Sequence, residues 1–133
     1  MKHPSMPDNP DDAHADHVQA ERERRAQTRL TELAAADIAP RPWRPAPVPP
    51  SAVDLAQFAL WRSNALNPED LVQALTLLPA ARAEVEGLEA GLLFTARSAG
   101  LTWAQIAQAM GFRSPQACQQ HYTRLSARQD SGS

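Results

Sequence analysis

The chain has 133 residues, of which 12 are prolines and only one, Cys118, is a cysteine. A single cysteine excludes an internal disulfide, and no apolar run is long enough to span a bilayer, so we expect a cytoplasmic protein held together by burial alone. The net charge of −2 is unevenly spread. Residues 51–96 carry two arginines against six carboxylates, whereas residues 97–133 carry four arginines against one carboxylate. The C-terminal block is therefore the segment best suited to an anionic partner.

Residues 1–39 are predicted to form a polar arm. Residues 1–10 are polar and proline-bearing, which predicts disorder. From Asp11 to about Asp37 the composition is helical, but the apolar residues are too sparse to build a core: Val18, Leu30, Leu33 and Ile38. We expect a disordered or marginally helical arm. A basic arm that follows DNA phosphates is the alternative.

Residues 40–50, PRPWRPAPVPP, are predicted to form a proline-rich linker. Prolines at this density exclude a helix or a central strand and favour an extended spacer. We expect the domain boundary here. Trp43 stands between Arg41 and Arg44, where it either packs on the nearby domain or docks on a partner or a DNA groove.

Residues 51–133 are predicted to form an all-α domain, a small helical bundle. Ser51 and Asp54 form a plausible capping pair before a helix over 52–64, and Asn67-Pro68 begins another helix that stops or kinks near Pro79. From residue 80 a long apolar stripe follows, closed by Gly100. We expect this stripe to be core: Ala81, Val85, Leu88, Leu92 and Ala96.

The segment LTWAQIAQAMGFRSPQACQQHYTRL, residues 101–125, predicts a helix-turn-helix. Thr102 caps a helix that Gly111 ends, and Ser114-Pro115 starts a second, recognition helix over about 115–127. Two short helices that meet at a sharp glycine turn define this motif. The inner face of the second helix is predicted to hold residues spaced by four and three: Cys118, Tyr122 and Leu125.

The outer face of that helix and its two ends supply the candidate DNA-binding residues: Arg113, Ser114, Gln116, Gln119, Gln120, Thr123, Arg124 and Arg128. A glutamine side chain can pair with adenine N6 and N7 in the major groove, and arginines can neutralise phosphates. Ser114 and the amides at the helix start could also hold a phosphate. The plainer interpretation is that exposed glutamines are good helix formers and need no partner.

The stretch SAGLTWAQIAQAMGFRSPQACQQHYTRL resembles the helix-turn-helix of small actinobacterial DNA-binding regulators. It is more distantly similar to the promoter-reading region of sigma factors. The resemblance covers residues 67–128, about half of the chain. It implies a cytoplasmic transcription regulator or a nucleoid-associated protein.

Other reactive residues offer no catalytic grouping. His14 and His17 have no further ligands at a spacing that suits zinc, so we expect no metal and no cofactor. Cys118 is expected in the core, and His121 is expected to be a partly exposed structural histidine, with pH sensing or a phosphate contact as alternatives. No nucleophile–base set or phosphate-cradling loop is present, so we do not expect an enzyme.

The sequence thus predicts a protein that docks its recognition helix in the major groove of double-stranded DNA. One such module makes few phosphate contacts, so we expect a homodimer or many copies along DNA to strengthen binding. Regulation of a promoter and packaging of the chromosome would use the same residues. The alternative is an interaction module that docks on RNA polymerase or a sigma factor without DNA contact, anchored by Trp43, Trp61 and Trp103.

Overall fold

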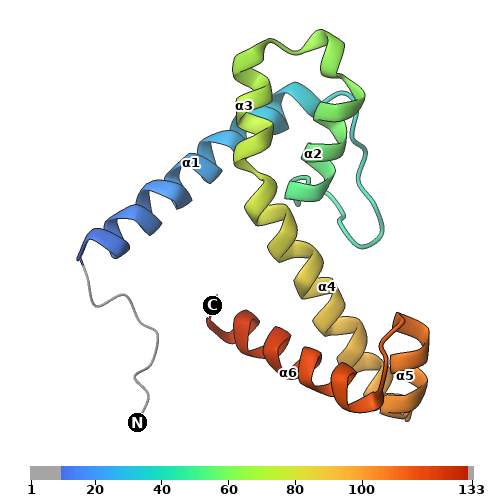
Figure 1. Ribbon diagram of the computed structural model, residues 1–133. Coiled ribbons are helices and arrows are strands. Elements are labelled where there is room, and N and C mark those ends of the chain that lie inside the picture. The colour runs from blue at the N-terminus through green and yellow to red at the C-terminus, as the bar shows by residue number, and fades with distance from the viewer. Residues whose placement is uncertain (1–9, 132–133) are drawn as a thin grey trace. The chain divides into compact units, whose positions relative to one another are not determined.

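The computed structural model describes residues 10–131, and this part of the chain folds only into helices (Figure 1). The elements are α1 (Pro10–Ala34), α2 (Ala52–Trp61), the 3₁₀ helix η1 (Ser63–Ala65), α3 (Pro68–Thr76), α4 (Leu78–Ser98), α5 (Trp103–Met110) and α6 (Pro115–Ser131). The predicted all-α class is confirmed. None of these helices combines the length and apolar character needed to cross a membrane.

Two compact units make up the chain, and the division between them falls inside α4. The N-terminal unit extends to Ala81, and the C-terminal unit begins at Arg82. This division differs from the predicted one, which separated residues 1–39 and the linker 40–50 from a domain at 51–133. The difference arises because α1 and the proline-rich segment both pack within the N-terminal unit.

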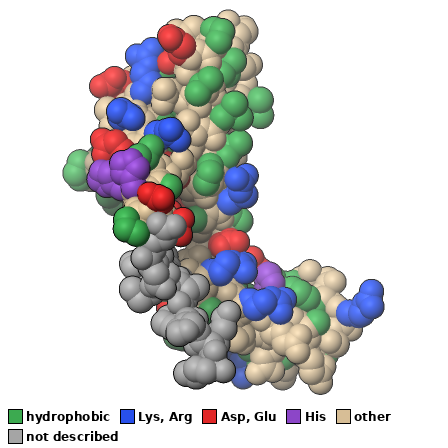
Figure 2. Space-filling view, turned by 60° about the vertical axis from the view of Figure 1, so that its left-hand side comes forward, with side chains coloured by type: hydrophobic (Ala, Val, Ile, Leu, Met, Phe, Trp, Pro, Cys, Tyr) green, Lys and Arg blue, Asp and Glu red, His purple; other side chains and the backbone are tan. Residues whose placement is uncertain are grey.

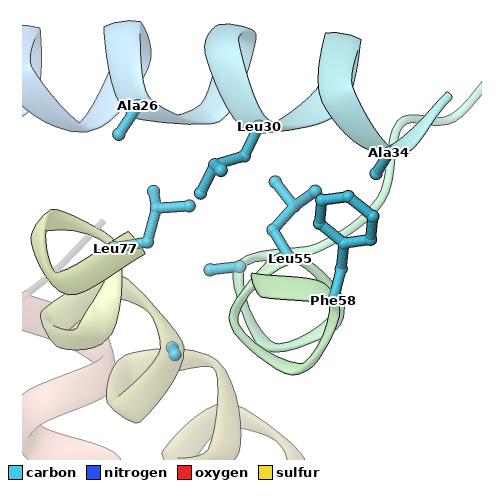
Figure 3. Packing of buried hydrophobic residues seen from close by; sticks show 8 residues of the cluster. Ala26, Leu30, Ala34, Leu55, Phe58 and Leu77 are labelled. Carbon is cyan, nitrogen blue, oxygen red and sulfur yellow. The ribbon is translucent and has the colours of Figure 1, made fainter. Parts of the chain in front are cut away.

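Helix α1 contributes part of the N-terminal core, so its description as a marginal arm is wrong. Ala26, Leu30 and Ala34 are fully buried. Figure 3 shows them pointing from α1 toward Leu55 and Phe58 of α2, and toward Leu77, which caps the C-terminal end of α3. A sparse apolar face suffices here because residues spaced by four lie on one side of a helix, and two other helices close over that side. Residues 1–9, also predicted as disordered, lie outside the described residues.

The proline-rich segment 40–50 is folded onto the N-terminal unit and does not act as a spacer. Its Arg44 is buried, with Nε 3.0 Å from Asp54 Oδ2 and Nη2 donating to the Ala39 carbonyl at 2.9 Å. At the far end of the segment, Gln27 of α1 donates to the Pro50 carbonyl at 2.6 Å. Trp43 remains exposed. An arginine buried beside a carboxylate thus fastens a segment that has too few backbone donors to form a helix.

The predicted starts of the N-terminal helices are confirmed. Ser51 Oγ accepts from the Asp54 amide at 3.2 Å while Asp54 Oδ2 accepts from the Ser51 amide at 3.1 Å, which closes a capping box. Asn67 caps α3 with Pro68 in the first turn. The first residues of these helices could be predicted from the sequence because each cap depends only on two residues three positions apart.

Of two expectations about this region, one is confirmed and one requires correction. The helix that begins at Asn67-Pro68 stops near Pro79 as predicted, since α3 ends at Thr76, and Pro79 lies in the first turn of α4, where its missing N–H costs no helical hydrogen bond. The stripe predicted as core is largely exposed, with Val85, Leu88 and Leu92 at 52%, 62% and 70% of their full accessibility. Burial falls instead on the neighbouring face of α4, which packs against α5 and α6.

Replacing Leu30 with alanine tests whether α1 is part of the fold. We expect Leu30→Ala to lower the free energy of unfolding of the N-terminal unit by about 2–5 kcal/mol, because it removes buried methyl groups and leaves a cavity. Urea denaturation followed by far-UV circular dichroism measures the change. Leu60→Ala is the control, since Leu60 is 79% exposed and its truncation should change stability by no more than about 0.5 kcal/mol. Equal losses in the two variants would contradict the packing of α1.

Candidate nucleic-acid interface

A compact core holds the last part of α4 against α5 and α6. Its buried members come from all three helices: Leu93, Ile106, Ala107, Cys118 and Leu125. Tyr122, half-buried, packs on the same cluster, with its ring centroid 5.7 Å from that of Trp103. The inward face predicted for the second helix is therefore confirmed. Burial raises the pKa of the Cys118 thiol, and the nearby Glu89 charge adds to the effect, so this cysteine serves as a small core residue.

The turn between α5 and α6 is built on a glycine in the left-handed conformation. Gly111 has φ +79°, and its amide donates to the Gln108 carbonyl at 3.3 Å. The next amide, of Phe112, donates to the Ala107 carbonyl at 2.8 Å. This pair of bonds is the Schellman motif, which satisfies the last carbonyls of α5 and turns the chain away. The predicted stop of the first helix is confirmed.

The start of α6 is set by Ser114 and Pro115. Ser114 Oγ accepts from the Ala117 amide at 3.1 Å, and Pro115 occupies the first helical position. The capping oxygen keeps its own hydroxyl proton, which is free to be donated to a phosphate oxygen. The helix is longer than predicted, since it continues past residue 127 to Ser131.

The outer face of α6 gathers most of the predicted binding residues. Because successive residues turn by about 100° around a helix, positions spaced by three and four share one side. Five side chains accordingly line one shallow surface hollow: Gln116, Gln119, Gln120, Thr123 and Arg124. Four of them are amides or a hydroxyl, so the face offers hydrogen-bond donors and acceptors with a single positive charge. Arg113 is exposed in the turn before the helix.

One member of this face is already engaged. Thr123 Oγ1 donates to the Gln119 carbonyl at 3.0 Å, one helical turn earlier. Its oxygen can still accept a hydrogen bond, but its proton is committed to the backbone. The amide groups of Gln116 and Gln120 therefore carry more of the donor capacity of this face than Thr123 does.

Arg128 differs from the other predicted phosphate ligands because it makes an ion pair within the unit. Its Nε and Nη2 each lie 3.3 Å from an oxygen of Glu86 on α4. His121, on the same edge of α6, has Nε2 2.6 Å from Glu89 Oε2. Both contacts join α6 to α4. Arg128 thus helps to hold the recognition helix in place, while Arg113 and Arg124 make no ion pair with any described residue.

The positive charge of the C-terminal unit is smaller than the sequence block 97–133 indicated. From Arg82 onward the chain has five arginines against four carboxylates, because the glutamates of α4 belong to the same unit. In the lower part of Figure 2 the blue side chains form no continuous patch, and red and purple side chains lie among them. Binding to an anion would therefore depend on where each arginine lies more than on the net charge.

Four contacts of this unit were not anticipated from the sequence. Glu86 and Glu89 hold α6, and Arg97 lies over the Trp103 ring at 4.9 Å from its centroid while donating to the Leu101 carbonyl at 2.9 Å. Glu86 and Glu89 are three residues apart, and their partners His121 and Arg128 are seven apart, so each pair lies on one helix edge. That spacing could have indicated which residues share a helix edge. It could not have predicted the ion pairs, because the sequence of one helix does not determine how that helix is aligned with another.

The two histidines of α1 do not form part of a metal site in the described residues. Within residues 10–131 no three His, Cys, Asp or Glu side chains come close enough together to hold an ion.

Comparison with known families identifies the C-terminal helices. Residues 92–132 match the model of the Myb-like DNA-binding domain, so the chain carries a Myb-like domain near its C-terminus. The match begins in the last turns of α4 and spans α5, the glycine turn and α6, which is less than half of the chain. No curated protein and no solved structure matches the chain, so the expected likeness to actinobacterial regulators and sigma factors gains no support from named relatives.

The left-handed turn provides a test of this geometry. We expect Gly111→Ala to destabilise the C-terminal unit by about 1–2 kcal/mol, because a β-carbon resists a positive φ. Gly91→Ala is the matched control, since Gly91 lies in the middle of α4, and the same methyl group there should stabilise the helix by up to about 1 kcal/mol. An added Cβ meets no atom within 4 Å at either position, so only the backbone angle distinguishes the two variants. Thermal or urea unfolding of each variant measures the difference, and a neutral Gly111→Ala would contradict the turn.

Proposed function

We propose that the C-terminal unit binds double-stranded DNA by laying the outer face of α6 in the major groove. The observation that carries the proposal is the agreement of two independent findings. The Myb-like match covers α5 and α6, and the same α6 turns an amide-rich face to solvent while its other side is buried. A helix held by a core on one side and free on the other is the element that a groove accepts.

Arg113 and Arg124 are the proposed phosphate ligands. They are exposed near opposite ends of the amide face and have no carboxylate partner among the described residues. Arginines so placed can contact the DNA backbone on either side of the groove and set the register of the helix. Ser114 adds a hydroxyl at the helix start. Arg128, held by Glu86, supports the position of α6 and is not assigned to phosphate.

Gln116, Gln119 and Gln120 are the proposed base-reading residues, with Thr123 beside them. A glutamine amide presents a donor and an acceptor together, which matches the N6 and N7 edge of adenine. Carboxylates are absent from this hollow, so the DNA would meet no fixed negative charge there. A weakly charged face of this kind relies on hydrogen bonds for its specificity and has a small electrostatic component of affinity.

The wider role follows from the same site. We propose a non-catalytic, cytoplasmic protein that acts as a transcription regulator or as a nucleoid-associated protein and needs no metal or cofactor. The match of residues 92–132 to a DNA-binding domain supports this assignment. Several amides directed at base edges favour regulation at particular sites over packaging that is indifferent to sequence.

A second candidate function is docking on a protein of the transcription machinery, such as RNA polymerase or a sigma factor. The N-terminal unit favours it, because Trp43 and Trp61 are exposed and an apolar groove of about 530 Å³ opens between α2 and α3. Green side chains at the surface in the upper part of Figure 2 show how much hydrophobic surface this unit presents. Trp103 is not available as the third anchor, since it packs on the C-terminal core.

The arginine pair separates the two functions. We expect Arg113→Ala combined with Arg124→Ala to reduce duplex binding strongly and to lower the slope of log affinity against log salt by about two, since each lost phosphate contact contributes about 0.9. Fluorescence anisotropy of a labelled duplex at several salt concentrations gives both quantities. The full chain is used throughout.

Arg128→Ala is the matched control for that experiment. It removes an equal charge from the same helix, but that charge is already paired with Glu86. We expect a smaller loss of affinity and a nearly unchanged slope. If wild-type protein shows no binding at low salt, the docking function replaces DNA binding. If the double variant binds like wild type, the assignment of the two arginines is wrong.

The glutamine face makes a separate prediction about specificity. Once a preferred site has been selected from random duplexes, Gln116→Ala or Gln120→Ala should weaken binding to it by about 1–3 kcal/mol and leave binding to unrelated DNA unchanged. The salt slope should also stay the same, because no phosphate contact is lost. Competition titrations with specific and unrelated duplexes measure the ratio. An equal loss on both duplexes would show that these amides do not read bases.

A further inference from the structure

The C-terminal unit has a second exposed surface that DNA binding does not use. An apolar groove of about 490 Å³ runs between α4 and α5 on this unit. Five of its lining residues are large, exposed apolar side chains: Val85, Leu88, Leu92, Leu101 and Met110. None of them belongs to α6, so the groove and the amide face share no residue. Exposed apolar side chains in a continuous patch are unfavourable in water and mark a surface that another molecule covers.

We propose that this groove is the interface of a homodimer in which α4 of one copy packs antiparallel on α4 of a second copy. The spacing of the exposed stripe is the first observation that supports a second copy as the occupant. Val85, Leu88 and Leu92 are separated by three and then four residues, which is the spacing of a two-helix seam. Because the same stripe is on both copies, the surface is complementary to itself under a two-fold axis.

Charge at the margins of the stripe is the second observation, and it selects the antiparallel direction. Arg82 and Glu89 are seven residues apart and therefore flank the stripe on the same side. In an antiparallel pair the corresponding flanks face each other, so Arg82 of each copy comes near Glu89 of the other. In a parallel pair Glu84 of one copy would come near Glu89 of the other, and like charges repel.

The two flanking side chains are suited to this contact. Arg82 is exposed and makes no ion pair with any described residue of its own chain. Glu89 is half-buried beside the groove, and its Oε2 is held 2.6 Å from His121 Nε2. A carboxylate already fixed in place by a hydrogen bond loses less conformational freedom when it meets a cation. The arrangement thus uses a free arginine and a positioned glutamate twice in each dimer.

Sedimentation equilibrium of the full chain without DNA is the test of this interface. We expect a reversible dimer whose dissociation constant rises at least about tenfold in Leu88→Glu, because a carboxylate would be buried in an apolar contact. Leu75→Glu is the matched control, since Leu75 is an equally exposed leucine in the N-terminal groove and should leave the dimer intact. Far-UV circular dichroism confirms that both variants remain folded.

A charge exchange tests the direction of the helices. Arg82→Glu alone and Glu89→Arg alone should each weaken self-association, because each places like charges together at both ends of the pair. A mixture of the two variants should form a heterodimer more tightly than either variant pairs with itself, since both contacts are then attractive. This gain is expected only where Arg82 faces Glu89 of the other copy.

Three results would overturn the proposal. They are a wild-type chain that stays monomeric at every concentration, a dimer lost in Leu75→Glu but kept in Leu88→Glu, and a mixture that associates no better than its components. The second result would move the interface to the N-terminal groove. Because the measurement is made without DNA, failure here leaves the proposed role of α6 untouched, and failure to bind DNA leaves the dimer untouched.

Discussion

The backbone angle at Gly111 determines what α6 can present. With φ at +79° the last carbonyls of α5 are satisfied by the amides of Gly111 and Phe112, and the chain leaves α5 in a new direction. From that point the rotation of α6 about its own axis is set by which residues enter the core. Cys118 and Leu125 point into the core, so the glutamines, which lie on the opposite side of α6, must face outward. The orientation of the amide-rich face is thus a consequence of the turn and the core together.

Contacts across α4 and α6 complete this constraint. His121 and Arg128 lie at the border between the buried and exposed sides of α6, and each is bound by a glutamate of α4. An exposed ion pair such as that of Arg128 with Glu86 adds little to stability. The effect of the two contacts on orientation is larger, because two fixed points seven residues apart resist rotation of the helix. The acidic residues of α4 reduce the charge that the unit offers to DNA, yet they steady the face that would read it.

Local signals in the sequence predicted the helix ends, and the structure bears them out at Ser51, Asn67 and Thr102, whose caps involve residues three positions away. The gathering of the glutamines on one face was also predictable, since it needs only helical periodicity. Burial was not. Leu30 looked isolated and is fully buried, whereas the regular stripe at Val85 is exposed. Which apolar face is covered depends on helices distant in sequence, and periodicity within one helix carries no information about them.

Helix α4 belongs to both compact units, and this has a practical consequence for dividing the protein. If the proline-rich segment were taken as the domain boundary, a fragment would start at residue 51. That fragment would lack α1, so Leu55 and Phe58 would lose their packing partners and be exposed to water. A fragment that starts at residue 82 would open a new helix end in the middle of α4, with unsatisfied amides and no capping side chain. Cutting before Leu78 instead keeps the whole of α4, with Pro79 in its first turn. The smallest piece that carries the Myb-like match with α4 intact therefore begins at a helix start and not at the linker.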